Sequence, residues 1–254
     1  MKSSITGQIM QTVNIDLDIG ETVYSQTNTM CWMNDHISMD TNTGGGFFAG
    51  LGRALTGISF FITDFTSKGQ GHIAFAPRFP GTIIEKSFNT DESIICRKET
   101  FLCAQKSVSL EVFWQKKIGS GFFGGNGFML QKVKGPGVAW LDFSGELASK
   151  TLLPGEKILV HAGHVGAFEP TVKFDIQMLK GFKNILFGGE GLFLATLTGP
   201  GTIWLQSMPI MNLAEELMHY LPNQASGSHN NIATTVGAGV VGAALGGLFS
   251  DKKD

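Results

Sequence analysis

The residues with the clearest capacity for chemistry are two histidines, His161 and His164, separated by Ala162 and Gly163. Imidazole nitrogens bind zinc when a further ligand such as a carboxylate completes the site, and Glu169 is the nearest candidate. The spacing is typical of a turn between strands. The pattern of β-helix metalloenzymes, two histidines one residue apart and then a carboxylate, is missing. We therefore interpret both histidines as turn residues and predict no metal ligands.

Nucleophilic and phosphate-binding sites are also not indicated. The chain has no Gly-x-Ser-x-Gly nucleophile elbow, although a triad assembled in space stays open. The glycine clusters at 44–46, 124–127 and 188–191 precede predicted strands, and no Lys-Ser or Lys-Thr follows them, so they are interpreted as structural turns. The sequence predicts no catalytic residues, no cofactor and no enzyme activity.

The composition bounds the class of protein. Only 16% of the 254 residues are charged, against about a quarter in ordinary soluble domains. This low value favours a surface covered by other subunits or by membrane. A net charge of −2 disfavours nucleic acid as a partner. Three cysteines, an odd number, indicate reduced thiols, and the N-terminus lacks the apolar core of a signal peptide. We expect a cytoplasmic protein that is not secreted, and membrane association stays open.

An internal repeat is the strongest pattern in the sequence. Residues 187–191 (Phe-Gly-Gly-Glu-Gly) repeat 123–127 (Phe-Gly-Gly-Asn-Gly) at an offset of 64. Residues 199–205 repeat 135–141 as Gly-Pro-Gly-x-x-Trp-Leu at the same offset. A constant offset over a whole unit predicts two copies of one structural element.

A more divergent copy precedes these two, at an offset of 71 and with about five extra residues. The predicted domain is 1–209, with repeats of about 1–80, 81–145 and 146–209. The expected repeat turns share glycine or proline, which permit or preset turn dihedrals: Gly69, Gly71, Gly135, Pro136, Gly137, Gly199, Pro200 and Gly201.

The repeat unit is predicted to be β structure. Apolar and polar residues alternate over 171–178 and 108–114, the period of a strand with one buried face. We expect an all-β fold whose three repeats close around a shared core with pseudo-threefold symmetry. Trp140 and Trp204 occupy equivalent positions, with Ala74 as the third, and are expected in a core, an oligomer interface or a ligand cavity.

The chain changes character after residue 209. A capping-box start at Asn212 predicts a short amphipathic helix over 210–222, followed by a polar linker over 223–231. The tail, 232–254, contains an uncharged run over 232–249. Small residues recur in it every four positions, the spacing that lets helices approach closely in a membrane: Ala238, Gly239, Gly242, Ala243 and Gly246. Membrane insertion, helix association and a passive tail all stay open.

These motifs resemble those of the altered inheritance of mitochondria protein 24 family, a mitochondrial biogenesis family with many prokaryotic members. The signatures are the two Gly-Pro-Gly-x-x-Trp-Leu segments, the Phe-Gly-Gly-x-Gly segments, and the runs Phe60–Thr66, Gly191–Gly201 and Trp204–Ser207. The resemblance covers about residues 5–209. It implies a double-stranded β-helix fold grouped with the tryptophan-RNA attenuator-like proteins, often oligomeric, with a role in organising the mitochondrial inner membrane. It implies no catalytic residues.

Two classes of function follow. The first is a non-enzymatic oligomeric β scaffold, with a trimer favoured, that associates with partner proteins or with membrane through 232–249. The second is a small-molecule-binding module or an enzyme with a pocket between the repeats.

Overall fold

The computed structural model describes residues 1–26, 29–42, 62–116, 128–178, 193–209 and 213. The predicted linker and tail, and all of the predicted helix over 210–222 except Leu213, lie outside the described residues. So do the three glycine clusters. Nearly all of the described regular structure is β-strand, and the all-β expectation is confirmed.

The strands in the described residues are β1 (Lys2–Thr6), β2 (Thr12–Leu17), β3 (Thr22–Gln26), β4 (Met30–Met33), β5 (Ile37–Asn42), β6 (Ile62–Ser67), β7 (Gly71–Phe75), β8 (Gly81–Phe88), β9 (Ser93–Arg97), β10 (Phe101–Gln105), β11 (Ser109–Lys116), β12 (Phe128–Lys134), β13 (Gly137–Ser144), β14 (Leu147–Leu152), β15 (Lys157–His161), β16 (Val165–Phe168), β17 (Lys173–Met178), β18 (Phe193–Thr198) and β19 (Gly201–Gln206). Two short 3-10 helices, η1 (Lys98–Thr100) and η3 (Ala162–His164), interrupt them.

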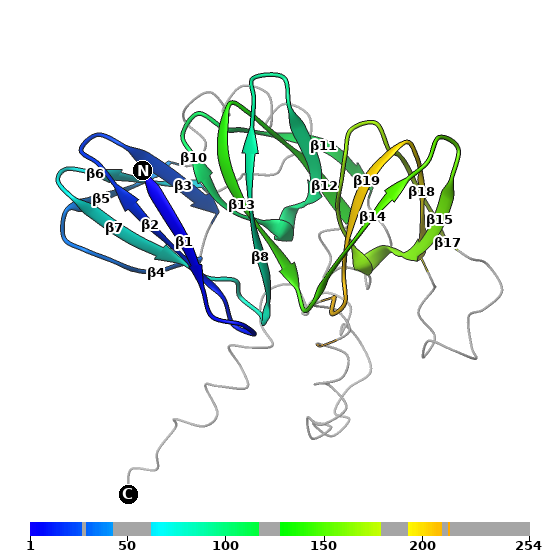
Figure 1. Cartoon of the computed structure of the whole chain (residues 1–254), viewed down its shortest axis with the longest axis horizontal. Helices are drawn as coiled ribbons and strands as arrows, with labels where there is room; N and C mark the ends of the chain where they lie inside the picture. The colour runs from blue at the N-terminus through cyan, green and yellow to red at the C-terminus, as the bar shows by residue number, and fades with distance from the viewer. Residues whose placement is uncertain (27–28, 43–61, 117–127, 179–192, 210–212, 214–254) are drawn as a thin grey trace, which may run out of the picture.

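The strands form four antiparallel sheets. Sheet A has the order β1-β2-β7-β4, sheet B β5-β6-β3-β10-β13-β8, sheet C β11-β12-β9-β16-β19-β14, and sheet D β15-β18-β17. Figure 1 shows them in a row along the long axis of the molecule, with β4 to β7 at the left and β15, β17 and β18 at the right.

The sheet orders are related by a simple rule. Raising every strand number of sheet B by six gives the order of sheet C. The β2-β7-β4 part of sheet A and the whole of sheet D follow the same rule, as β8-β13-β10 and β9-β12-β11 do in sheets B and C. We call strands whose numbers differ by six counterparts. Sheet B therefore joins β5, β6 and β3 to β10, β13 and β8. Sheet C joins their counterparts β11, β12 and β9 to β16, β19 and β14.

Three apolar cores lie between the sheets. The first core holds side chains of β2, β3, β6 and β7, together with Trp140 and Cys103 from β13 and β10. The second holds most of the β8–β13 side chains with Tyr24 from β3, and the third holds β14–β19 side chains with Ile95 from β9. Sheets B and C thus have an apolar core on both faces.

Local sequence explains this burial. In β2 the β-branched and aliphatic residues Val13, Ile15 and Leu17 are buried and alternate with Asn14 and Asp16, as expected for a strand with one covered face. In the interior strand β12, the consecutive residues 128–131 are all buried. A continuous buried run is typical of a strand whose sheet is covered on both sides.

Candidate functional site

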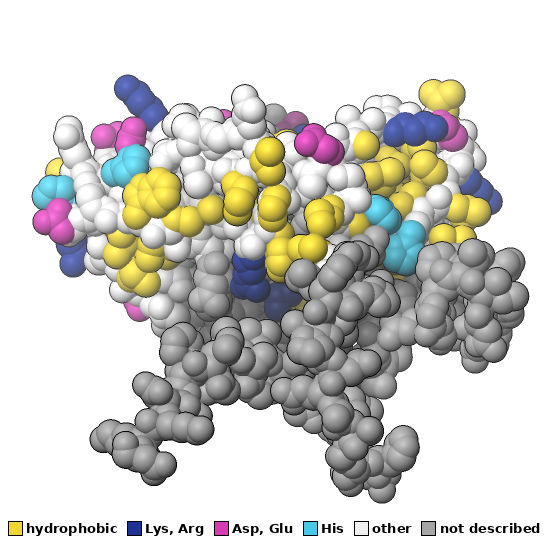
Figure 2. All heavy atoms as spheres, turned by 90° about the horizontal axis from the view of Figure 1, so that it is seen from below, with side chains coloured by type: hydrophobic (Ala, Val, Ile, Leu, Met, Phe, Trp, Pro, Cys, Tyr) yellow, Lys and Arg dark blue, Asp and Glu magenta, His cyan; other side chains and the backbone are white. Residues whose placement is uncertain are grey.

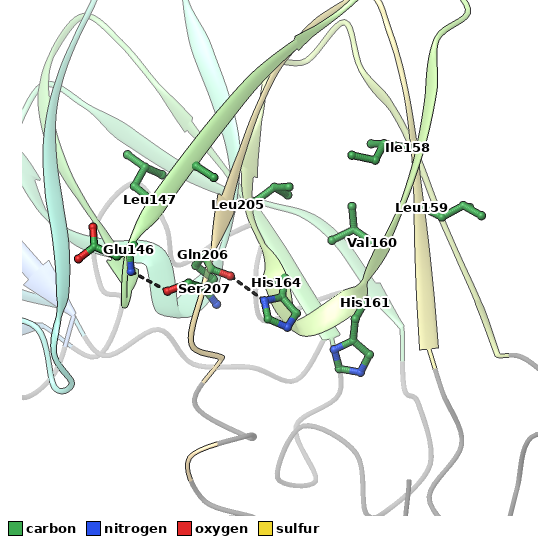
Figure 3. Close-up of a pocket in the computed structure, with 11 residues that line it drawn as sticks. Glu146, Leu147, Ile158, Leu159, Val160, His161, His164, Leu205, Gln206 and Ser207 are labelled. Atoms are coloured by element: carbon green, nitrogen blue, oxygen red, sulfur yellow. Dashed lines mark hydrogen bonds between the residues drawn. The ribbon is translucent and has the colours of Figure 1, made fainter. Parts of the chain in front are cut away.

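A pocket of about 420 Å³ opens between β14, β15, β19 and η3 (Figure 3). Its lining is mainly apolar, with a few polar groups at one end. The lining residues are Glu146, Leu147, Ala148, Ile158, Leu159, Val160, His161, His164, Leu205, Gln206 and Ser207.

The two histidines of the sequence analysis lie at the polar end of this pocket. His161 ends β15 and His164 lies in η3, with the ring centroids 5.8 Å apart and the planes at 70°. His164 Nδ1 lies 2.8 Å from the carbonyl oxygen of Gln206 and donates to it, which fixes the ring. Figure 3 shows both rings at the lower rim, below Val160.

The charge state of His161 follows from its surroundings. Partial burial lowers the pKa of His161, and the neighbouring His164 and Arg97 lower it further. The ring is therefore neutral at neutral pH, the state in which an imidazole has one nitrogen that accepts and one that donates a hydrogen bond.

Gln206 holds this end of the pocket together. Its side-chain nitrogen donates to the Gly163 carbonyl at 2.9 Å, and its side-chain oxygen accepts from the Ser144 amide at 3.1 Å. Arg97 Nη1 donates to the same Gly163 carbonyl at 3.0 Å. The turn at Gly163 is thus bonded to β9 and β19, and Gln206 in turn joins β19 to the end of β13. No sequence motif points to Gln206, because its partners lie 43 and 62 residues away.

The third ligand considered for a metal is held elsewhere. Glu169 Oε2 accepts a hydrogen bond from the Thr202 amide at 2.9 Å, which joins the β16–β17 turn to β19. Within the described residues no group of three histidine, cysteine or acidic side chains is placed to hold a metal ion. The pocket geometry suits a small ligand with an apolar body and a polar end that meets the two imidazoles.

The predicted repeat turns have a steric role. The Gly135–Pro136 and Gly199–Pro200 bonds are cis, and Gly137 and Gly201 follow with φ of +129° and +137°. A Cβ on Gly137 would lie 2.5 Å from Ser107 Oγ, and one on Gly201 would lie 2.5 Å from Thr171 Oγ1. Only glycine fits these positions without strain.

The first-copy glycines are also close to neighbouring atoms. A Cβ on Gly69 would lie 3.0 Å from the His36 ring, and one on Gly71 would lie 2.5 Å from Ser67 Oγ. Each of these glycines, like those of the two Gly-Pro-Gly turns, lets the chain turn closely against a neighbouring strand.

The two equivalent tryptophans differ in burial. Trp140 is 1% exposed and belongs to the first core, with its Nε1 donating to Glu85 Oε2 at 3.0 Å. Trp204 is half-buried against the second core, with Lys86 Nζ 5.6 Å from its ring centroid. Both therefore pack on the core that precedes their own strands.

The tail residues of the sequence analysis, Ala238, Gly239, Gly242, Ala243 and Gly246, lie outside the described residues. Across the described ranges, no helix is long and apolar enough to span a bilayer. Cys96 and Cys103 are buried and Cys31 is exposed, and all three are free.

Comparisons with known proteins give a consistent result. A family model described as mitochondrial biogenesis AIM24 matches residues 3–208. An uncharacterized protein of Streptococcus pyogenes serotype M6 is 30% identical over 227 residues, covering 84% of this chain and 88% of that protein. The X-ray crystal structure of another Streptococcus pyogenes protein superposes with a TM-score of 0.71 at 28% identity, covering 87% of this chain and 99% of the other.

Proposed function

Since the chain belongs to the mitochondrial biogenesis AIM24 family, we propose that it is a non-enzymatic, oligomeric β scaffold that associates with partner proteins or with membrane. The proposal places it in the cytoplasm, with membrane association through 232–249. The observation that carries it is the sheet arrangement, in which strands far apart in sequence combine into continuous sheets with an apolar core on each side.

The scaffold consists of three related units, β2–β7, β8–β13 and β14–β19, in the double-stranded β-helix or attenuator-like manner that the resemblance implies. Support comes from the recurring strand order. The strand irregularity also recurs, between Met30 and Trp32, between Phe101 and Cys103, and between Val165 and Ala167. These places are separated by 71 and then 64 residues, the two offsets of the sequence repeat.

Side-chain hydrogen bonds support the same units. Asn34 Oδ1 accepts from the His72 amide at 3.2 Å, Gln105 Oε1 from the Val138 amide at 2.8 Å, and Glu169 Oε2 from the Thr202 amide at 2.9 Å. Each bond joins the end of the third strand of a unit to its last strand. The accepting side chain is Asn, Gln or Glu, but the bond occupies the same place in each unit. This is expected when the bond satisfies a backbone amide of the fold and does not serve to bind a ligand.

Oligomerisation is the second part of the proposal, with a trimer favoured. Its support is the low fraction of charged residues and the exposed large apolar side chains. Figure 2 shows such side chains in a broken band across one face of the molecule. Over the whole described surface, the exposed large apolar side chains include Ile9, Met10, Ile19, Trp32, Met39, Phe113, Leu153, Leu159 and Met208.

Light scattering of the full chain and flotation with liposomes test this proposal. We expect an oligomer at micromolar concentration, and flotation that decreases when residues 223–254 are removed. If the full chain is a monomer, the proposed oligomerisation is wrong. If the full and shortened chains float equally, the proposed membrane association through the tail is wrong.

A second candidate function is a small-molecule-binding module or an enzyme, and the pocket beside His161 and His164 favours it. A ligand there would displace water from an apolar wall and meet the neutral imidazole of His161. Thermal-shift screening of the wild type against His161→Ala and Leu205→Ala tests this. A ligand that stabilises only the wild type would establish binding at the pocket.

A further inference from the structure

Two strand edges at opposite ends of the sheets have no partner among the described residues. β4 pairs with β7 on one side only, and β15 pairs with β18 on one side only. Their counterparts are paired on both sides: β10 and β16, the counterparts of β4, pair with β3 and β9, the counterparts of β15. We call the β10–β3 and β16–β9 pairings joints, because each one joins two neighbouring units. The edge strands β4 and β15, at the two ends of the row of sheets, are the two strands from which a third joint of this kind could form.

The register of the missing joint can be read from the existing ones. Cys103 lies opposite Ser25 in the first joint and Ala167 lies opposite Cys96 in the second. The repeat offsets of 71 and 64 carry Ser25 to Cys96 and then to Val160, and carry Trp32 to Cys103 and then to Ala167. The corresponding end pair is therefore Trp32 opposite Val160.

The end of sheet D exposes an apolar side chain that its counterparts bury. Tyr24 in β3 is 2% exposed and Ile95 in β9 is 1% exposed, each in the core of the following unit. Leu159 occupies the same position in β15 and is 64% exposed. Leu159 carries the side chain for a following core that the described residues do not supply.

The end of sheet A shows the complementary feature. Cys103 and Ala167 are fully buried against the preceding unit, beside Trp140 and Trp204 on the next strand. In the first unit the sizes are exchanged, because Trp32 lies beside Ala74.

Each of these cross-strand pairs thus contains one tryptophan and one small residue. Trp140 fills the preceding core, whereas Trp32 is 49% exposed. Trp32 therefore has the size and position to pack against a preceding unit, and the described part of the chain contains no such unit.

Charge distinguishes β4 from the other sheet edges. Natural edge strands usually carry a charged residue that opposes pairing with another chain. Among the described sheets, the edges β1, β5, β8, β11, β14, β15 and β17 each contain at least one Lys, Asp or Glu. β4 reads Met-Cys-Trp-Met and contains none. It is an apolar edge suited to strand addition.

We propose that β4 of one chain pairs antiparallel with β15 of a second copy, with Trp32 opposite Val160 and Met33 opposite Leu159. Trp32 then packs on the third core of the second copy, and Leu159 on the first core of the first. This inference rests on the proposed scaffold function and identifies its self-assembly surface. The joined sheets would form a seven-stranded sheet, in which the six strands other than β1 follow the order of sheets B and C.

The contact is head to tail. Figure 1 shows β4 and β15 at opposite ends of the row, so one chain cannot close the joint on itself. Two different surfaces are used, which makes the interface heterologous: successive copies close into a ring, or continue as a filament.

Single-edge variants of the full chain test the proposal, measured by light scattering and sedimentation velocity. Trp32→Glu blocks the β4 edge and Leu159→Glu blocks the β15 edge. Phe113→Glu, with the same 49% exposure as Trp32, and Leu153→Glu, at 69%, are matched controls away from the joint. A buried unpaired charge and a lost central aromatic should raise the dissociation constant about 30-fold or more.

We expect each edge variant to be monomeric and both controls to assemble as the wild type does. A mixture of the two edge variants should form one 1:1 dimer and nothing larger, because a single intact joint remains between them. That dimer also shows that both variants are folded.

Three results would overturn the proposal. Assembly unchanged in both edge variants would reject this joint while leaving the oligomeric scaffold intact. Loss of assembly in Trp32→Glu alone would indicate two β4 edges meeting each other. A full chain that is monomeric, and assembles only when residues 214–254 are removed, would identify its own tail as the occupant of the edge.

Discussion

Glu92 Oε2 accepts a hydrogen bond from the backbone amide of Asn89 at 2.8 Å, and the backbone amide of Glu92 donates one to the Asn89 carbonyl oxygen at 3.1 Å. The same side-chain bond joins Glu21 to Asp18 and Glu156 to Leu153. The β2–β3, β8–β9 and β14–β15 turns are thus closed by one carboxylate each.

Replacing Glu92 by Gln should lower the thermal unfolding midpoint at pH 7. Hydrogen bonding to Asn89 lowers the pKa of Glu92 below its ordinary value. A lowered folded-state pKa gives stability that is present above the unfolded pKa of about 4.3 and is lost as pH falls through the folded value. The difference between wild type and Glu92→Gln should therefore shrink at pH 3. Glu111→Gln, on an exposed position of β11, is the control and should change neither midpoint.

Ionisation of Asp142 should make the stability of the fold depend on pH in the direction opposite to that of Glu92. Burial raises the pKa of Asp142 to about 7, and its buried Oδ1 has no hydrogen-bond partner among the residues that the structure describes. A raised acid pKa means that the folded state binds more protons than the unfolded state between about pH 4 and pH 7, so stability falls as pH rises through this window.

Asp142→Asn removes the ionisable group and should stabilise the protein above pH 7, by up to about 4 kcal/mol, with little effect near pH 4. Urea unfolding at the two pH values measures this. Asp91→Asn, on an exposed turn, serves as control. An unchanged pH slope in Asp142→Asn would mean that another group causes the dependence.

Two glycine substitutions separate crowding from backbone strain. Gly137 and Gly155 both have positive φ, of +129° and +78°, but an added Cβ meets Ser107 Oγ at 2.5 Å only at Gly137. Gly155→Ala should cost about 1 kcal/mol of unfolding free energy, the cost of left-handed backbone, and Gly137→Ala more than about 2 kcal/mol. Equal losses in urea unfolding would show that the Ser107 contact relaxes freely.

The equivalent tryptophans should respond differently to truncation. Trp140→Phe leaves a gap in the first core and removes the hydrogen bond to Glu85, with an expected loss of about 2 kcal/mol. Trp204→Phe, at a half-buried position, should cost less than about 1 kcal/mol. Denaturant unfolding followed by circular dichroism measures both. A larger loss at Trp204 would contradict the burial that separates them.

Much of this structure follows from local sequence. The alternation of Val13, Asn14, Ile15 and Asp16 specifies a strand and its covered face, because successive side chains point to opposite sides. The Gly-Pro-Gly segments specify turns, because Gly137 and Gly201 need backbone dihedrals that other residues resist. The family motifs likewise lie in contiguous segments. These features depend on neighbours along the chain, so sequence alone determined them.

Tertiary structure decided what depends on residues distant in sequence. Gln206 meets Gly163 and Ser144 only after β19 has paired, so its role at the pocket carried no sequence signal. The sequence left a core, an oligomer interface and a ligand cavity open for Trp140. It fills the core of β2–β7, because sheet B has a core on each face. Trp32 and Leu159 read as ordinary apolar strand residues. Their exposure follows from sheet order, because β4 and β15 are edge strands and no further strand of the described residues lies beside either one.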